Sequence, residues 1–302
     1  RTFLSDQDSQ NRAKLIDRLL TAPEYARRMR EAFSVMLLER RKGTTVSAED
    51  WNRFLELSFS QNQSWAEVVR ALLQADAAND ETYGSVKFFV DGGRADHDQM
   101  TQDVARLFLG MNIHCAQCHD HPTVDQFKQI DYVGLMAYLN QSVSAQHSGL
   151  QRTFLVENVA KAKVEFESVF DVGNKQQTGP RLPGRDEIEI PTYEEGQEFS
   201  EPEKDGLPGV PKFRPRQLLA TQLTESSNQR FVENAVNRFW FLMMGRGLVH
   251  PLDMMHDKNP ASHPELLSLL ANEFVKGPGP KFSSGDLVFL SLIHICRCRR
   301  AI

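Results

Sequence analysis

Residues 114–122 read HCAQCHDHP and bring two thiols and three imidazoles together in one short stretch. Thiolates and imidazoles are ligands that transition metals favour. The only other cysteines, Cys296 and Cys298, lie at the far end of the chain. Side chains that bind a metal or cofactor together fix the backbone around it. This cluster therefore constrains the local fold more than any other feature of the sequence.

The centre of the cluster is Cys115-Ala116-Gln117-Cys118-His119, a Cys-x-x-Cys-His motif. This spacing is typical of c-type haem attachment. Two thiols three residues apart can each add to one vinyl group of a porphyrin, and the imidazole that follows can ligate the iron. The motif therefore predicts a covalent haem c on Cys115 and Cys118, with His119 as the iron ligand.

Two neighbours of His119 are expected to lie just outside the coordination sphere. The Asp120 carboxylate could accept the Nδ1–H of His119 and make that imidazole more basic, or Asp120 could be a turn residue before Pro122. His121 is too close to His119 in the chain to reach the opposite face of the same haem. Candidates for a ligand on that face are Met36, Met136, His97 and His147, and an open coordination position is an equal alternative.

Two other uses of the cluster stay open. Cys115, Cys118, His119 and His121 are a set of sulfur and nitrogen ligands that zinc favours, and His114 could replace one of them. A tetrahedron built from seven consecutive residues is cramped, however, because structural zinc sites usually draw their ligands from two separated pairs. A disulfide between Cys115 and Cys118 is the third interpretation, and it gives the following histidine no necessary role.

Bulk composition limits the function classes. Of the 302 residues, 40% are hydrophobic and 25% are charged, which is typical of a chain that buries a core. We expect no membrane span in this fragment, because no run of 18 or more apolar residues occurs. The net charge of -5 argues against a nucleic-acid partner, because nucleic-acid-binding proteins usually carry a basic surface. The sequence does not decide the oligomeric state.

The two ends of the chain are unusual. The chain opens on Arg1 without a signal-peptide pattern, so we expect a truncated start that has lost an export signal. After Phe289 the sequence reads LSLIHICRCRRAI, which resembles the translated end of a sequencing adapter. Residues 290–302 are therefore interpreted as an artefact, with a short basic extension as the alternative. In the first case Cys115 and Cys118 are the only native cysteines.

Hydrophobic periodicity predicts a mainly helical chain. Helices are expected at 11–20, 68–73, 101–109, 132–139 and 228–244, with a long one from Pro23 through Leu37. Thr21 with Glu24, and Ser64 with Glu67, form capping-box patterns in front of two of these helices. The alternation over 163–170 predicts a strand, and the Gly- and Pro-rich stretch 173–215 predicts loops.

These elements predict a mainly α, multidomain fold with a small β-containing segment between two helical parts. We place a helical cytochrome c-like domain with the CAQCH motif at residues 1–148, and a β- and loop-rich connecting segment at 149–215. A helical second domain follows at 216–289, and the resemblance described below implies that it is the N-terminal part of a truncated domain. Residues 290–302 are the expected artefact.

Several stretches resemble the planctomycete cytochrome c-like domain, a family of unknown function that is named for its Cys-x-x-Cys-His. They are residues 13–20, 23–25, 101–110, 115–122, 131–132 and 137–139, within a likeness that covers 11–210. His114 departs from the family, which has a Gln-like residue there, and is therefore a poor candidate for a ligand. The second half resembles the planctomycete-specific domain that usually follows, at 216–220, 237–240, 245–249 and 262–267.

The resemblance implies an exported, haem-bearing protein of multidomain architecture and brings no established reaction. We therefore expect a c-type haem protein that acts in electron transfer or haem-assisted redox chemistry with a redox partner protein. The motif itself implies the periplasm, because haem c is attached outside the cytoplasm. The alternative is a non-redox structural or binding protein, polysaccharide-related among other options, with a zinc or disulfide staple. A hydrolase is a weaker idea, because no paired carboxylates or nucleophile elbow stand out. Whether the chain is an enzyme stays open.

Overall fold

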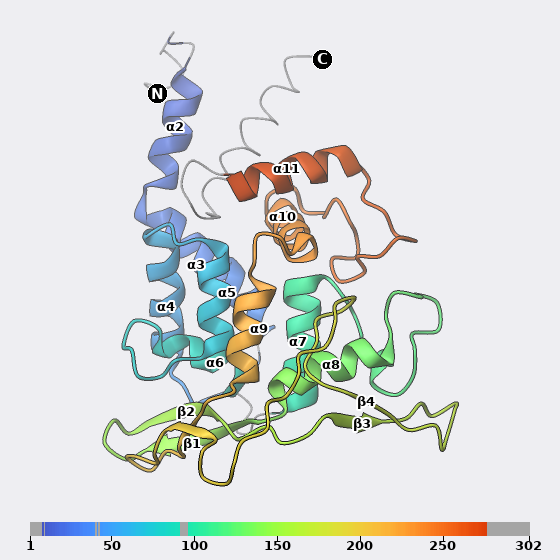
Figure 1. The fold of residues 1–302 in the computed structure, drawn as a ribbon. Helices are drawn as coiled ribbons and strands as arrows, with labels where there is room; N and C mark the ends of the chain where they lie inside the picture. Colours follow the sequence, from blue (N-terminus) through green and yellow to red (C-terminus); the bar gives the residue numbers. More distant parts are fainter. Residues whose placement is uncertain (1–7, 9, 40, 42, 91–95, 277–302) are drawn as a thin grey trace.

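The computed structural model describes residues 8, 10–39, 41, 43–90 and 96–276. Within these residues the fold is mainly α-helical, with three small β-hairpins in the middle of the chain (Figure 1), as the sequence predicted. The stretch interpreted as an artefact, 290–302, lies outside the described residues. None of the described helices is both long and apolar enough to cross a bilayer.

The helices form two groups in the sequence, one on each side of the hairpins. The first group contains α2 (Asn11–Leu20), α3 (Pro23–Leu38), α4 (Ala48–Ser60), α5 (Trp65–Gln74), α6 (Lys87–Val90), α7 (His97–Leu109) and α8 (Gln129–Leu139). Two short 3₁₀ turns, η1 (Tyr83–Val86) and η2 (Cys115–Gln117), lie among them. The second group is α9 (Pro215–Leu223), α10 (Gln229–Met244) and α11 (Pro264–Lys276).

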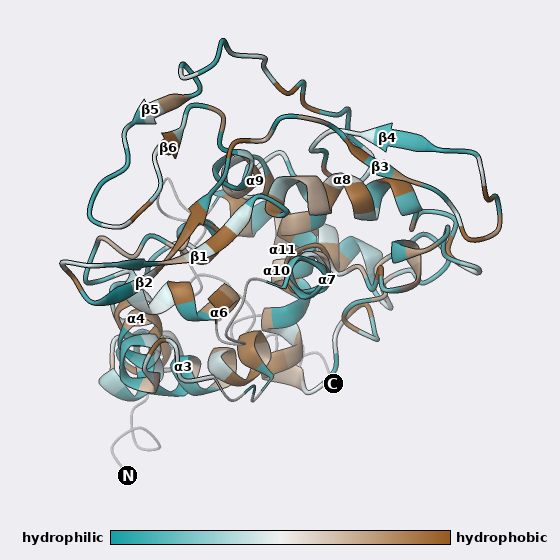
Figure 2. Ribbon diagram, turned by 90° about the horizontal axis from the view of Figure 1, so that it is seen from below, coloured by the Kyte–Doolittle hydropathy of each residue, from teal (hydrophilic) through white to brown (hydrophobic). Residues whose placement is uncertain are grey.

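Three antiparallel two-stranded sheets connect the two groups. The pairs are β1 (Ser142–His147) with β2 (Arg152–Glu157), β3 (Val164–Phe166) with β4 (Gln176–Thr178), and β5 (Phe199–Glu201) with β6 (Val210–Pro211). The first two hairpins lie beneath the helices in Figure 1, and Figure 2 shows all three from below. The boundary predicted at residue 148 falls in the turn between β1 and β2.

Of the capping boxes predicted at Thr21 and Ser64, the one at Ser64 forms. Ser64 Oγ accepts the N–H of Glu67, and the Glu67 carboxylate accepts the N–H of Ser64, so α5 begins as predicted. The prediction at Thr21 is wrong, because α3 starts after Ala22 with no side-chain cap. The Thr21 hydroxyl instead donates to the carbonyl of Asp17 at the end of α2 (3.1 Å). Two helices that follow each other so closely compete for one side chain.

The strand predicted over 163–170 forms only at Val164–Phe166. After Phe166 the chain no longer pairs with β4 and turns toward the CAQCH motif. There the Val169 N–H donates to the Cys118 carbonyl (3.1 Å). Alternating residues indicated an extended chain, but they could not show that another segment would accept this backbone hydrogen bond.

One hydrophobic core joins the two helical groups. The ring of Phe239 in α10 lies 5.1 Å from that of Phe33 in α3 and 5.7 Å from that of Trp65 in α5, between centroids. Phe239 also packs 6.1 Å from Phe274 in α11. All four side chains are buried, and each fully buried aromatic stabilises the fold by roughly 1.5–3 kcal/mol. The second helical group thus packs into the same core as the first.

Candidate functional site

The CAQCH loop, residues 110–128, begins where helix α7 ends. Gly110 ends α7 in the left-handed conformation, with φ of 65°, which glycine adopts without strain. A Cβ at this position would lie 2.6 Å from the sulfur of Met255. A larger residue would therefore strain the backbone and also displace a side chain from the second helical group.

The segment 253–258, which lies between α10 and α11, holds the CAQCH loop on both sides of the motif. Before the motif, the Asn112 N–H donates to the carbonyl of Asp253 (2.7 Å). After the motif, Lys258 forms an ion pair with Asp125 (2.7 Å). The position of the loop therefore depends on residues that are far away in the sequence.

The motif presents two thiols to solvent, because Cys115 and Cys118 are both exposed and free. His119 is half-buried, and its Nδ1 lies 2.6 Å from the main-chain carbonyl oxygen of Asp120. A carbonyl can only accept, so Nδ1 carries the proton and the lone pair of the neutral ring is on Nε2. Metal-ligating histidines usually have this arrangement, in which the second nitrogen donates to a carbonyl or carboxylate.

The carboxylate of Asp120 does not form the hydrogen bond predicted with His119. Its Oδ1 accepts the N–H of Gln129 at the start of α8 (2.9 Å), and its Oδ2 pairs with Lys128 (3.0 Å). Partial burial raises the pKa of Asp120, but the Gln129 N–H and the positive charge of Lys128 outweigh it and hold that pKa below its usual value. Asp120 thus orients His119 through its main chain, while its side chain fixes the turn that leads into α8.

The side chain of His121 closes the turn after the motif. Its Nδ1 accepts the N–H groups of Thr123 (3.3 Å) and Val124 (3.1 Å). Because Nδ1 accepts, the neutral ring carries its proton on Nε2 and has no free lone pair for a metal. Burial, helped by the nearby His256 and His119, lowers the pKa of His121 and keeps the ring neutral at neutral pH.

The sequence did not indicate that the turn after β3 belongs to this site. We call Val169, Phe170 and Val172 the apolar turn. The Phe170 ring lies 4.8 Å from the His119 ring, between centroids. Phe170 is 81% exposed and Val172 78%, more than any other large hydrophobic residue in the described ranges. The sequence did carry a signal, because positions 169–172 hold three apolar residues, Val169, Phe170 and Val172.

The candidates for the opposite haem face have other surroundings. His97 Nε2 lies 2.8 Å from the Ser142 carbonyl, and His147 Nδ1 accepts two backbone N–H groups of its own turn. Met36 and Met136 pack against the hydrophobic core. In the part of the chain that the structure describes, no three His, Cys, Asp or Glu side chains converge as a metal site. The four residues of the zinc alternative are therefore not preassembled.

Two family models match the chain. Residues 1–144, which include the motif, match PSCyt2, a protein of unknown function (DUF1549). Residues 215–280, which include the segment that holds the CAQCH loop, match PSD1, a protein of unknown function (DUF1553). No curated protein and no solved structure matches the chain. Residues 1–144 thus match a planctomycete cytochrome-like domain and residues 215–280 match the PSD1 domain that follows it, as the sequence resemblance predicted.

Proposed function

We propose that the CAQCH loop carries a covalent haem c and that the protein acts in electron transfer or haem-assisted redox chemistry. The observation that carries the proposal is the state of His119. Its Nδ1 bonds to the Asp120 carbonyl at 2.6 Å, which leaves the Nε2 lone pair free to ligate iron. Cys115 and Cys118 are exposed, free thiols at the spacing that haem attachment requires.

The apolar turn fits a haem in the same place. The macrocycle is large and apolar, and its burial helps to set the reduction potential. The backbone N–H of Val169 donates a hydrogen bond to the main-chain carbonyl of Cys118, and the Phe170 ring packs beside His119. The side chains of the turn nevertheless stay exposed. Exposed apolar patches mark binding sites more often than chance surface. Covering each of these side chains would contribute about 1–3 kcal/mol.

The residues of this chain would each have a defined task. Cys115 and Cys118 would hold the ring edge by thioether bonds, and His119 would ligate the metal through Nε2. The bound haem would supply a one-electron iron couple. The hydrogen bond from His119 to the Asp120 carbonyl would make the imidazole more basic, and so a stronger ligand for the iron. The apolar turn, with Phe170, would keep water from one side of the ring.

The zinc and disulfide alternatives are supported less well. For His121 to ligate zinc through either nitrogen, it would have to give up the two backbone hydrogen bonds that Nδ1 accepts, because ligation through Nε2 moves the proton to Nδ1. A disulfide between Cys115 and Cys118 gives no role to the orientation of His119 or to the exposed apolar turn. Haem c is attached outside the cytoplasm, so we also propose an exported, periplasmic protein that exchanges electrons with a partner protein.

The experiment is expression of the exported chain with the haem c maturation machinery, followed by a pyridine haemochrome spectrum and an intact mass. We expect the mass of one haem. Cys118→Ser should keep one thioether and move the haemochrome band to longer wavelength. His119→Ala should perturb the ligand-sensitive bands, whereas His114→Ala, at an exposed neighbour outside the motif, should leave the spectrum unchanged. Protein from its own host without covalent haem would contradict the proposal.

A further inference from the structure

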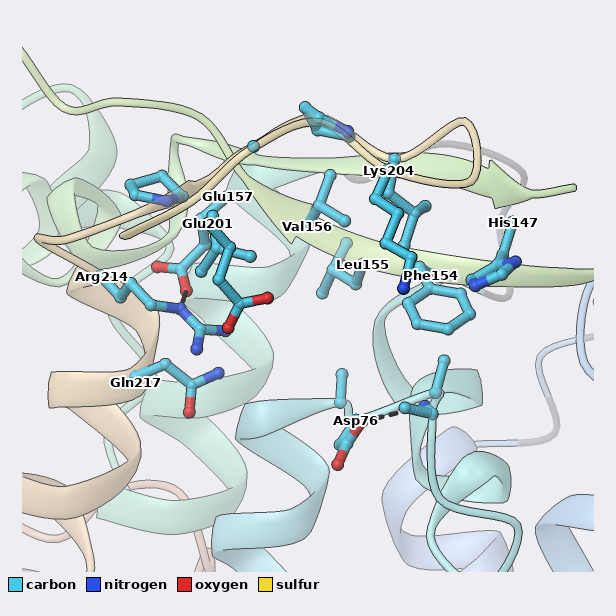
Figure 3. A pocket seen from close by; sticks show the side chains of 18 of the residues that line it. Asp76, His147, Phe154, Leu155, Val156, Glu157, Glu201, Lys204, Arg214 and Gln217 are labelled. Carbon is cyan, nitrogen blue, oxygen red and sulfur yellow. Dashed lines mark hydrogen bonds and ion pairs between the residues drawn. The ribbon is translucent and has the colours of Figure 1, made fainter. Parts of the chain in front are cut away.

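A second candidate site lies among the hairpins. A cavity of about 580 Å³ is bounded by the C-terminal end of α5, by β2, by the segment 201–211 and by the start of α9 (Figure 3). None of its lining residues belongs to the CAQCH loop or to the apolar turn. Its volume lies in the range of roughly 300–1,000 Å³ that is typical of small-molecule sites.

The walls of this cavity are fixed by one buried guanidinium. Arg216 in α9, whose side chain is 1% exposed, donates to the carbonyls of Leu73 (2.8 Å) and Gln74 at the end of α5. It also donates to the carbonyl of Leu155 in β2 (2.7 Å). Glu157 accepts the backbone N–H of Arg216 (2.8 Å). Three of the four walls are thus joined before any ligand arrives, which lowers the ordering cost of binding.

One end of the cavity has an aromatic surface. Phe154 and His147 pack with their ring centroids 5.1 Å apart, and Figure 3 shows Lys204 reaching down beside Phe154. Phe154 and Val156 are half-buried, so each keeps part of its surface free. This end therefore offers an apolar contact next to a cation.

The rest of the lining is polar and carries charge of both signs. Glu201 and Gln217 lie near Arg214 at the other end, and Asp76 lies between the two ends (Figure 3). Among the described residues, neither Asp76 nor Glu201 has a cationic partner within ion-pair distance, and Lys204 has no anionic one. Asp76 Oδ1 accepts the N–H of Ala78 (2.9 Å), which leaves Oδ2 as its free acceptor. The cavity thus offers carboxylates without a cationic partner and a lysine without an anionic one within the same space.

A lining with charges of both signs favours an uncharged ligand whose groups both donate and accept hydrogen bonds. A polyanion or a polycation would meet repulsion from one of the two sets of charges. Hydroxyl groups serve both as donors to carboxylates and as acceptors from Lys and amide groups. A sugar ring also has an apolar C–H face that fits against an aromatic side chain. We propose that this cavity binds an uncharged saccharide segment, with its ring face on Phe154 and its hydroxyls on Asp76, Glu201 and Lys204.

The test is calorimetric titration of the full chain with three uncharged probes: cellohexaose, xylohexaose and mannohexaose. We expect saturable binding of at least one probe. Phe154→Ala and Glu201→Gln should each weaken it about tenfold, as loss of one aromatic contact or one charge-assisted hydrogen bond does. Glu195→Gln, at an exposed glutamate outside the cavity, should bind as the wild type does.

The site is independent of the haem, so binding should be the same with and without haem attachment. Circular dichroism and thermal unfolding establish that each variant is folded, and Glu201 is exposed, so its substitution should not affect folding. Absence of saturable binding to all three probes would overturn the proposal. So would binding that neither variant weakens. Binding of the dipeptide Lys-Glu in place of the saccharides, with the same dependence on both variants, would identify a peptide site and overturn it too.

Discussion

Replacing His121 by alanine separates the haem and zinc uses of the motif. In the structure the ring is a turn-closing group, because its Nδ1 accepts the backbone N–H groups of Thr123 at 3.3 Å and Val124 at 3.1 Å. The ring also stands edge-on to Phe127, with 5.7 Å between centroids. None of these contacts involves Cys115 or a metal-ligating nitrogen.

The expected loss of stability follows from these contacts. A neutral hydrogen bond contributes about 0.5–1.5 kcal/mol, and the longer bond falls at the weak end of that range. The edge-on aromatic contact adds about 0.5 kcal/mol. Because His121 is only half-buried, water can satisfy the freed N–H groups, so His121→Ala should lower the free energy of unfolding by about 1–2 kcal/mol. His121→Asn keeps an acceptor close to the position of Nδ1 and should recover about half of this loss.

The assay is iron and zinc analysis, haem mass and urea unfolding of the wild type and both His121 variants. In a haem site, iron and covalent haem should stay stoichiometric in all three proteins. In a zinc site, loss of one of four ligands should expel or weaken the metal, because binding energy there is folding energy. Stoichiometric zinc in the wild type that vanishes in His121→Ala, with no iron in either protein, would refute the haem assignment. An asparagine variant as unstable as the alanine variant would refute the turn-closing role.

Three further substitutions test the structure around the two sites. Arg216→Met should lower the free energy of unfolding by about 3–5 kcal/mol, because it leaves the buried carbonyls of Leu73, Gln74 and Leu155 without the hydrogen bonds that the guanidinium donates; a loss below about 1 kcal/mol in urea unfolding would contradict this. Gly110→Ala should destabilise more than Gly184→Ala, because both have positive φ but only Gly110 has atoms within 4 Å of the new Cβ; equal thermal shifts would contradict the clash. Burial raises the pKa of Asp131 above 3.8, so the native state holds this proton more tightly than the unfolded chain. The stability from Asp131 is therefore greatest below pH 3.8 and falls as pH rises through the raised pKa. As pH rises through this range, the wild type should lose stability relative to Asp131→Asn, which has no carboxyl group to ionise. A difference in free energy of unfolding between the two proteins that does not change with pH would contradict the assignment.

Local features of the sequence determined much of the helical part. Helix α10 was expected at 228–244 and spans Gln229–Met244, because its apolar spacing and the glycine that follows act within a few turns. The box at Ser64 formed because both of its partners lie in one turn. The box at Thr21 failed because the end of α2 uses the same hydroxyl, a competition that a pattern in one helix does not reveal.

For the site, the sequence by itself determined the candidate ligands, since Cys115, Cys118 and His119 are fixed by their spacing alone. Only the structure showed which nitrogen of His119 is free, because Lys128 and the Gln129 N–H at the start of α8 bind the Asp120 carboxylate and the main-chain carbonyl of Asp120 accepts from Nδ1 instead. It alone brought Phe170 against His119 from a hairpin that the sequence predicted as a plain strand. The reason is physical: periodicity and spacing record which residues share a local face, whereas hydrogen-bond partners and ring contacts between distant segments depend on how the whole chain packs.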